Sequence, residues 1–203
     1  QTYLDNPNQS AVMEITKIYE KVATLPKRYY GASATLALVY RAFAKDNQSN
    51  SSVVIKHIGD SRVYHFSAMT KTWRCITRDH NLLNQIVDEQ AAAENRQADF
   101  GKYNQEGMAS PLYALTDCLI ADSDLDSNPM PAFDSQTLKV SSGDCLVVCT
   151  DGVHDLVLCD EWQGIDKHTN LQAWLKQLRK QIYASEGRAY DNATAILVKF
   201  DEH

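Results

Sequence analysis

The chain has 203 residues, of which 44% are hydrophobic and 23% charged, and its formal net charge is −6. This length fits one domain with an ordinary core. The acidic balance excludes a broad nucleic-acid surface, which needs clustered Lys and Arg. No apolar run could span a bilayer, and the polar start QTYLDNPNQS is not a signal peptide. We therefore expect a single domain over residues 1–203, with neither a nucleic-acid nor a membrane partner.

The five cysteines are spaced irregularly and form no CxxC pair, so the sequence predicts no zinc site. Cys145 and Cys149 lie in an apolar run and are expected to be small buried side chains. A reducing, cytoplasmic setting fits this cysteine usage best.

The first half predicts one helix followed by strands. Residues 10–24 have helical spacing, with Val12, Ile15, Ile18 or Tyr19, and Val22 on one face. Strands are predicted at 34–44, 53–58, 62–66 and 73–77, with a polar loop at 45–52. We expect 53–58 and 62–66 to form a hairpin through Gly59, as part of an antiparallel meander.

In the second half of the chain, predicted helices alternate with predicted strands. Helices are predicted at 81–97 and 170–185, and strands at 136–140, 145–149 and 193–200. The segments 98–111, 121–135 and 186–192 are expected to be loops, and 112–119 is ambiguous. Runs of strands without regular βαβ alternation favour an α+β fold.

Four aspartates lie at predicted strand ends: Asp60, Asp79, Asp151 and Asp191. Carboxylates gathered from distant parts of a chain are the ligands that Mg²⁺ and Mn²⁺ prefer. The alternative for each is ordinary turn or cap chemistry, and Asp60 could pair with its neighbour Arg62. Neither His80 nor His154 has a matched second metal ligand in the sequence. The run ADSDLDSN lacks the glycine and final Glu of a calcium loop.

Six motifs in order carry a resemblance across residues 31–198. They are GASATLAL, IGDSRVY, ITRDHNLL, YALTDCL, GDCLVVCTDGVHDLV and DNATAILV. This set resembles the metal-dependent type 2C protein serine/threonine phosphatases in their bacterial form. The resemblance implies two packed antiparallel sheets with helices on both outer faces, a four-layer sandwich. It also implies that residues 81–112 cover a flap.

The resemblance implies a mechanism as well: two Mg²⁺ or Mn²⁺ ions activate a water that attacks a phosphoserine or phosphothreonine of a protein substrate. Asp151 and Asp191 would be the catalytic ligands of the ion pair. Asp79 would bind a third, weaker ion that shares Asp151, with Asp155 reached through water. Gly152 would let the backbone pass close to the site. Asp60 and Asn192 would be structural residues beside it.

The resemblance stops short of the family's N-terminal motifs. No Arg followed by an acidic NED-like cluster and no DGMGG-like turn is found, and the chain begins with Gln1. We expect part of an active phosphatase. A phosphatase-like module that binds a phosphoprotein or regulatory partner without hydrolysis is the alternative, and a plain α+β interaction domain is a third. The sequence leaves the physiological substrate and the oligomeric state open.

Overall fold

The computed structural model describes residues 7–42, 52–95, 111–121, 130–167, 170–185 and 192–201. The chain divides into two compact units. The first comprises Gln1–Gly59 and Leu115–Val140, and the second comprises Asp60–Ala114 and Ser141–His203. Each unit is described by itself, and the single domain over residues 1–203 stays a prediction.

The first unit contains one long helix and two small antiparallel sheets. In chain order its elements are α1 (Pro7–Ala23), η2 (Lys27–Tyr29), β1 (Ser33–Ala34), β2 (Leu36–Ala42), β3 (Ser52–Ile58), β6 (Leu119–Ile120) and β7 (Asp134–Lys139). One sheet pairs β1 with β6, and the other has the order β2-β3-β7.

Helix α1 packs through one face, as its spacing predicts. Tyr19 and Ala23 form a buried cluster with Ile58 of β3 and Leu119 of β6. The prediction that Val12 belongs to this face is wrong, since its side chain is 51% exposed. Burial of the face begins near Ile15, which is 4% exposed, so the apolar stripe covers only the later turns of α1.

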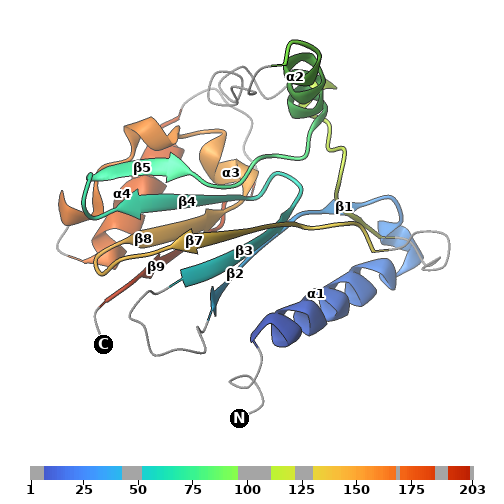
Figure 1. Cartoon of the computed structure of the whole chain (residues 1–203), viewed down its shortest axis with the longest axis horizontal. Coiled ribbons are helices and arrows are strands. Elements are labelled where there is room, and N and C mark those ends of the chain that lie inside the picture. The colour runs from blue at the N-terminus through green and yellow to red at the C-terminus, as the bar shows by residue number, and fades with distance from the viewer. Residues whose placement is uncertain are drawn as a thin grey trace. The chain divides into compact units, whose positions relative to one another are not determined.

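The second unit holds a four-stranded antiparallel sheet of order β5-β4-β8-β9 (Figure 1). Its strands are β4 (Arg62–Ser67), β5 (Thr72–Cys75), β8 (Cys145–Cys149) and β9 (Ala195–Lys199). Its helices are α2 (Leu82–Ala93), η3 (Pro111–Tyr113), α3 (Asp151–His154), η4 (Cys159–Glu161), η5 (Ile165–Lys167) and α4 (Leu171–Ala184).

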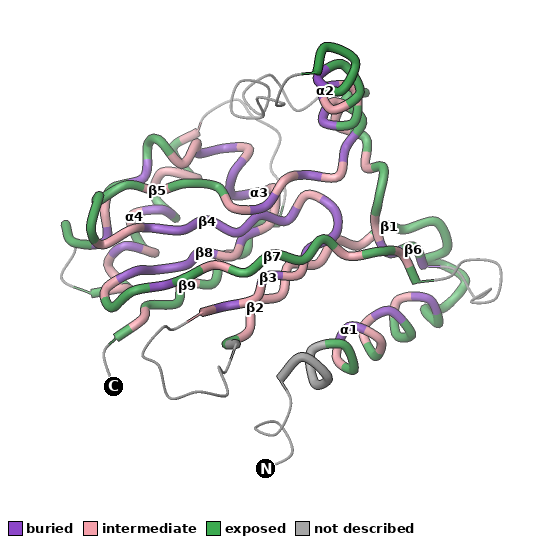
Figure 2. Tube along the Cα trace, in the orientation of Figure 1, coloured by how far each residue is buried: buried purple, intermediate pink, exposed green. Residues whose placement is uncertain are grey.

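The two central strands of this sheet, β4 and β8, are buried along most of their length (Figure 2). Trp174 and Leu178 of helix α4 pack into the core beside these strands. Phe66 of β4 and Trp162, which follows η4, belong to the same core. Burying a large apolar side chain stabilises the fold by roughly 1.5–3 kcal/mol. The Asn170 side chain caps α4 by accepting from the Ala173 N–H. Strand β8 is therefore fixed by strands on both sides and by the core of α4.

The predicted hairpin between 53–58 and 62–66 does not form. Strand β3 pairs with β2 and β7, while β4 pairs with β5 and β8. Because both edges of each strand are already occupied, the two cannot pair with each other. Gly59 has a φ of +92°, and a Cβ there would lie 2.2 Å from the Thr35 side chain. The glycine thus serves a close contact in the first unit, and not a hairpin turn.

The other predicted elements agree in type with the structure. The helix expected at 81–97 is α2, and Asn81 caps it. The predicted flap includes α2 and part of η3, but its residues 96–110 lie outside the described residues, as do the loop residues 45–51, 122–129 and 186–191. None of the described helices is long and apolar enough to cross a membrane. The prediction of an α+β fold built from antiparallel sheets is confirmed.

Candidate functional site

Asp151 lies two residues after Cys149, the last residue of the buried strand β8. It is the first residue of the short helix α3, and its side chain is half-buried. Its Oδ1 accepts a hydrogen bond from the Gly152 N–H at 2.9 Å. Since β8 is paired on both sides, the backbone that carries this carboxylate is held in place by the sheet.

Residues around Asp151 hold the segment that leads into β9. The Thr150 hydroxyl donates to the Asn192 carbonyl at 3.2 Å and accepts from the Thr194 N–H at 3.1 Å. A Cβ on Gly152 would lie 2.8 Å from the Asn192 carbonyl oxygen, so only glycine permits this approach. Asp191, the second predicted ligand, lies outside the described residues. The backbone carbonyl of its neighbour Asn192 lies against Thr150 and Gly152, and the structural role of Asn192 beside the site stays a prediction.

Asp60 lies two residues before β4 and is half-buried. Burial raises the pKa of its carboxyl group, and the negative charges of Asp151 and Asp79 raise it further, although His154 acts in the opposite direction. Because the charge of Asp151 acts on Asp60 through space, the two carboxyl groups lie near each other in the second unit. Asp60 is one of the four aspartates at predicted strand ends, and the family resemblance implies a structural role for it beside the site.

Asp79 is a buried carboxylate with a cationic partner. Arg62 donates to both of its oxygens, from Nε at 2.8 Å and from Nη2 at 2.5 Å. Burial acts against the charge of Arg62, but Asp79 outweighs it and raises the pKa of the guanidinium above its ordinary value. Arg62 therefore pairs with Asp79, and not with Asp60 as its position in the sequence suggested. The role of Asp79 as a metal ligand stays a prediction.

Asp155 is the C-cap of α3, one helical turn after Asp151, and its N–H donates to the Asp151 carbonyl at 2.9 Å. Its Oδ1 lies 3.0 Å from Nδ1 of His154, a side chain that is only 2% exposed. The other ring nitrogen of His154 lies 3.0 Å from the carbonyl oxygen of Asp60. The structure thus gives His154 two neighbours at the site that the sequence did not reveal.

The carboxylate oxygens of the second unit are of the type that binds a hard divalent cation, and Asp60 and Asp151 are the best candidates for ligands. Among the described residues, no basic side chain forms an ion pair with either, and a divalent cation would relieve their repulsion. The set is incomplete as described. Within the second unit, no three described His, Cys, Asp or Glu side chains bring ligand atoms within 4.8 Å of one another.

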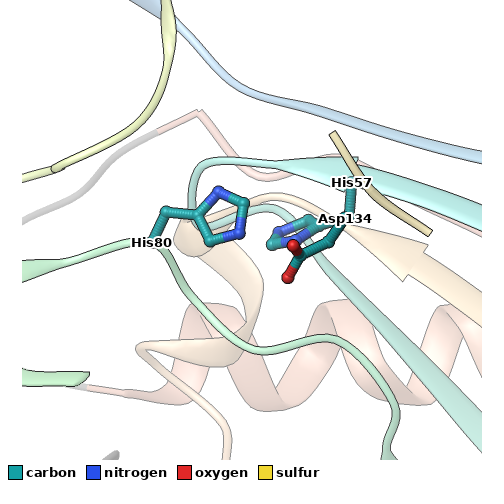
Figure 3. Close-up of side chains that lie close together, drawn as sticks. All are labelled: His57, His80 and Asp134. Carbon is teal, nitrogen blue, oxygen red and sulfur yellow. The ribbon is translucent and has the colours of Figure 1, made fainter. Parts of the chain in front are cut away.

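The first unit contains a separate His–Asp pair. His57 of β3 and Asp134 of β7 are opposite each other in the strand register, and their side chains lie close together (Figure 3) with ligand atoms within 4.8 Å. His80, which Figure 3 also labels, belongs to the second unit and is not counted with this pair. Two ligands are fewer than the three or four that hold zinc in proteins, so the pair alone does not define a metal site.

Comparisons with known proteins agree with the motifs. No family model matches the chain. The chain is 29% identical over 156 residues to the "Putative protein phosphatase" of Mycoplasma genitalium, covering 76% of this chain and 53% of that protein. It thus spans about half the length of this curated relative.

Two solved structures show the fold. The phosphatase Stp1 from Staphylococcus aureus matches with a TM-score of 0.70 and 20% identity, over 100% of this chain and 70% of that one. The catalytic domain of the phosphatase PstP, solved with two manganese ions, matches with a TM-score of 0.57 and 17% identity, over 93% of this chain and 67% of that one. The chain has the fold of the bacterial serine/threonine phosphatases. The resemblance to the type 2C phosphatases that six sequence motifs predicted is confirmed.

Proposed function

We propose that this protein hydrolyses phosphoserine and phosphothreonine in protein substrates with the help of Mg²⁺ or Mn²⁺. One observation supports the proposal: in a phosphatase fold, Asp151 follows the buried strand β8 and lies near enough to Asp60 that its charge adds to the effect of burial in raising the Asp60 pKa. Repulsion of this kind costs folding free energy unless a cation binds there.

The proposed roles follow from where each side chain lies. Asp151 would hold the cations from the rigid end of β8, and Asp191 would join it from the segment that Thr150 fixes through Asn192. We add Asp60 as a direct or water-mediated ligand and keep Asp155 as a ligand through water. Asp79 is the weakest candidate because Arg62 already occupies both of its oxygens. When bound, two or three divalent ions supply a water of lowered pKa and neutralise phosphoryl charge.

A second candidate is a module that binds a phosphoprotein without turnover. The pairing of Arg62 with both oxygens of Asp79, a predicted metal ligand, favours it. The two candidates share the fold and differ in whether bound phosphate is released.

Hydrolysis of a small aryl phosphate with Mn²⁺ titrated in tests the first candidate. We expect Mn²⁺-dependent turnover that is lost in Asp151→Asn and kept in Asp201→Asn, whose carboxylate pairs with Lys199 at 2.8 Å and is 69% exposed. Binding of a phosphoprotein with no turnover under any metal concentration would contradict the phosphatase and support the binding module.

We also propose a reducing compartment such as the cytoplasm. All five cysteines are free thiols, and burial raises the pKa of the Cys145 thiol to about 11, which leaves it unreactive at neutral pH. This setting would fit a protein phosphatase that acts on intracellular substrates.

A further inference from the structure

His154 is a buried polar side chain at the end of α3, with 3% of its surface exposed. It comes three residues after Asp151, yet its ring contacts a residue 94 positions earlier in the chain. Buried polar groups are usually retained only where they make hydrogen bonds. The question is what its contacts accomplish.

The first contact joins two segments that carry acidic side chains. The Nε2 of His154 lies 3.0 Å from the backbone carbonyl oxygen of Asp60. A carbonyl oxygen can only accept, so Nε2 carries the proton and donates. Strand pairing places Arg62 opposite Cys149, which brings these two segments into the same neighbourhood. The hydrogen bond from His154 then fixes the backbone of Asp60 itself.

The second contact points the other way. The Nδ1 of His154 lies 3.0 Å from Oδ1 of Asp155. This approach lacks hydrogen-bond geometry, since Nδ1 has no hydrogen-bond partner among the described residues. The hydrogen bond to Asp60 is therefore the contact that ties α3, which begins with Asp151, to the segment before β4.

We infer that His154 is a positioning residue, a tether that holds the backbone of Asp60 beside α3, where Asp151 would hold a divalent cation. This inference rests on the proposed function, because it assumes that Asp151 and its neighbours bind a cation. Residues that orient metal ligands in this way typically change metal affinity about 10- to 100-fold when they are replaced.

The alternative is that His154 merely fills space in the core. A matched pair of variants separates the two roles. In His154→Gln the amide nitrogen extends about as far as Nε2 and can still donate to the Asp60 carbonyl, whereas in His154→Asn the side chain is one methylene shorter and cannot reach it. Asparagine is also the smaller of the two, so His154→Met, which matches glutamine in length and cannot donate, is the control for volume. A space-filling role predicts that His154→Met behaves like His154→Gln, and the tether predicts that it behaves like His154→Asn.

The first measurement is amide hydrogen exchange of the metal-free protein over residues 59–63. We expect exchange about tenfold faster in His154→Asn and near the wild-type rate in His154→Gln, because only the first loses the hydrogen bond. Equal exchange in the two variants would overturn the tether. This readout does not depend on metal binding, so it decides the tether even if the proposed function fails.

The second measurement is Mn²⁺ affinity, followed through the electron paramagnetic resonance signal of free Mn²⁺. We expect about tenfold weaker binding in His154→Asn and less than about threefold in His154→Gln. Equal affinity in both variants would overturn the positioning role. No binding by the wild-type protein would instead overturn the proposed metal centre, with the exchange result standing by itself.

Discussion

The two ends of strand β8 carry carboxylates in opposite electrostatic situations. Asp144 immediately precedes the strand and accepts hydrogen bonds from the Ser141 N–H at 3.0 Å, from the Ala68 N–H at 2.8 Å and from His65 at 3.0 Å. Burial acts to raise its pKa, but these bonds outweigh it and the pKa lies below its ordinary value. At the other end, Asp60 and Asp151 repel each other and the pKa of Asp60 is raised.

This difference separates a carboxylate that the fold already pairs from two that we propose to bind a cation. The polar partners of Asp144 stabilise its charge, so it ties the Ser141–Asp144 turn to the end of β4 and to the residues beyond it. Asp60 and Asp151 have like charges as neighbours, which lowers the stability of the fold. A bound cation would offset this loss. The following changes test that division.

The largest expected effect is on Asp79, a carboxylate at the functional end that is nevertheless paired. Asp79→Asn should lower the free energy of unfolding by about 3–5 kcal/mol, because it leaves the buried charge of Arg62 uncompensated. Urea denaturation measures this loss. Asp88→Asn is the control, since the pair of Arg78 with Asp88 is 30% and 46% exposed and is worth about 1 kcal/mol or less. Unchanged stability with loss of one bound Mn²⁺ would make Asp79 a metal ligand instead.

A smaller effect is expected at the structural end. Asp144→Asn should cost about 1–3 kcal/mol at pH 7 by weakening hydrogen bonds to a buried charged group. Since the folded pKa of Asp144 is lowered, its contribution is present above the ordinary carboxyl pKa of about 3.9 and is lost as pH falls through the folded value. Unfolding curves between pH 2 and 7 should therefore be flatter for the variant than for wild type. Parallel curves would show that Asp144 is not preferentially ionised in the folded protein.

The smallest effect has the opposite sign. The folded pKa of Asp60 is raised, so its favourable contribution exists at low pH and is lost as pH rises through the folded value. At pH 7 the ionised side chain destabilises the metal-free protein. Asp60→Asn should then raise the melting temperature, by about 2–4 °C for each kcal/mol relieved. Added Mn²⁺ should stabilise wild type more than the variant. A lower melting temperature without metal would disprove the repulsion.

The sequence was most informative where a single strand or helix can be predicted from its own residues. The apolar run at 145–149 predicted a buried strand, and the TDG that follows placed Asp151 at its end, as the structure has it. The helical spacing at 170–185 likewise predicted α4. Each of these depends on local periodicity and burial, which a sequence states directly.

The sequence was least informative where the partner is distant. Gly59 between two strands suggested a hairpin, but β3 and β4 each find other partners. An ion pair between Arg62 and Asp60, two residues earlier, was the local alternative, yet Arg62 pairs with Asp79, 17 residues later. His154 contacts the backbone of Asp60, 94 residues earlier. Sheet order decides all three, and no local pattern encodes it.

The most direct test of the cation site at the end of β8 is a Mn²⁺ titration of the metal-free protein, with Asp151→Asn and Asp144→Asn as a matched pair from the two ends of the strand. Both variants remove one negative charge. We expect Asp151→Asn to weaken Mn²⁺ binding at least about 100-fold and Asp144→Asn to change it by less than about threefold, because only the first loses a proposed ligand. Equal affinities in wild type and Asp151→Asn would contradict the cation site.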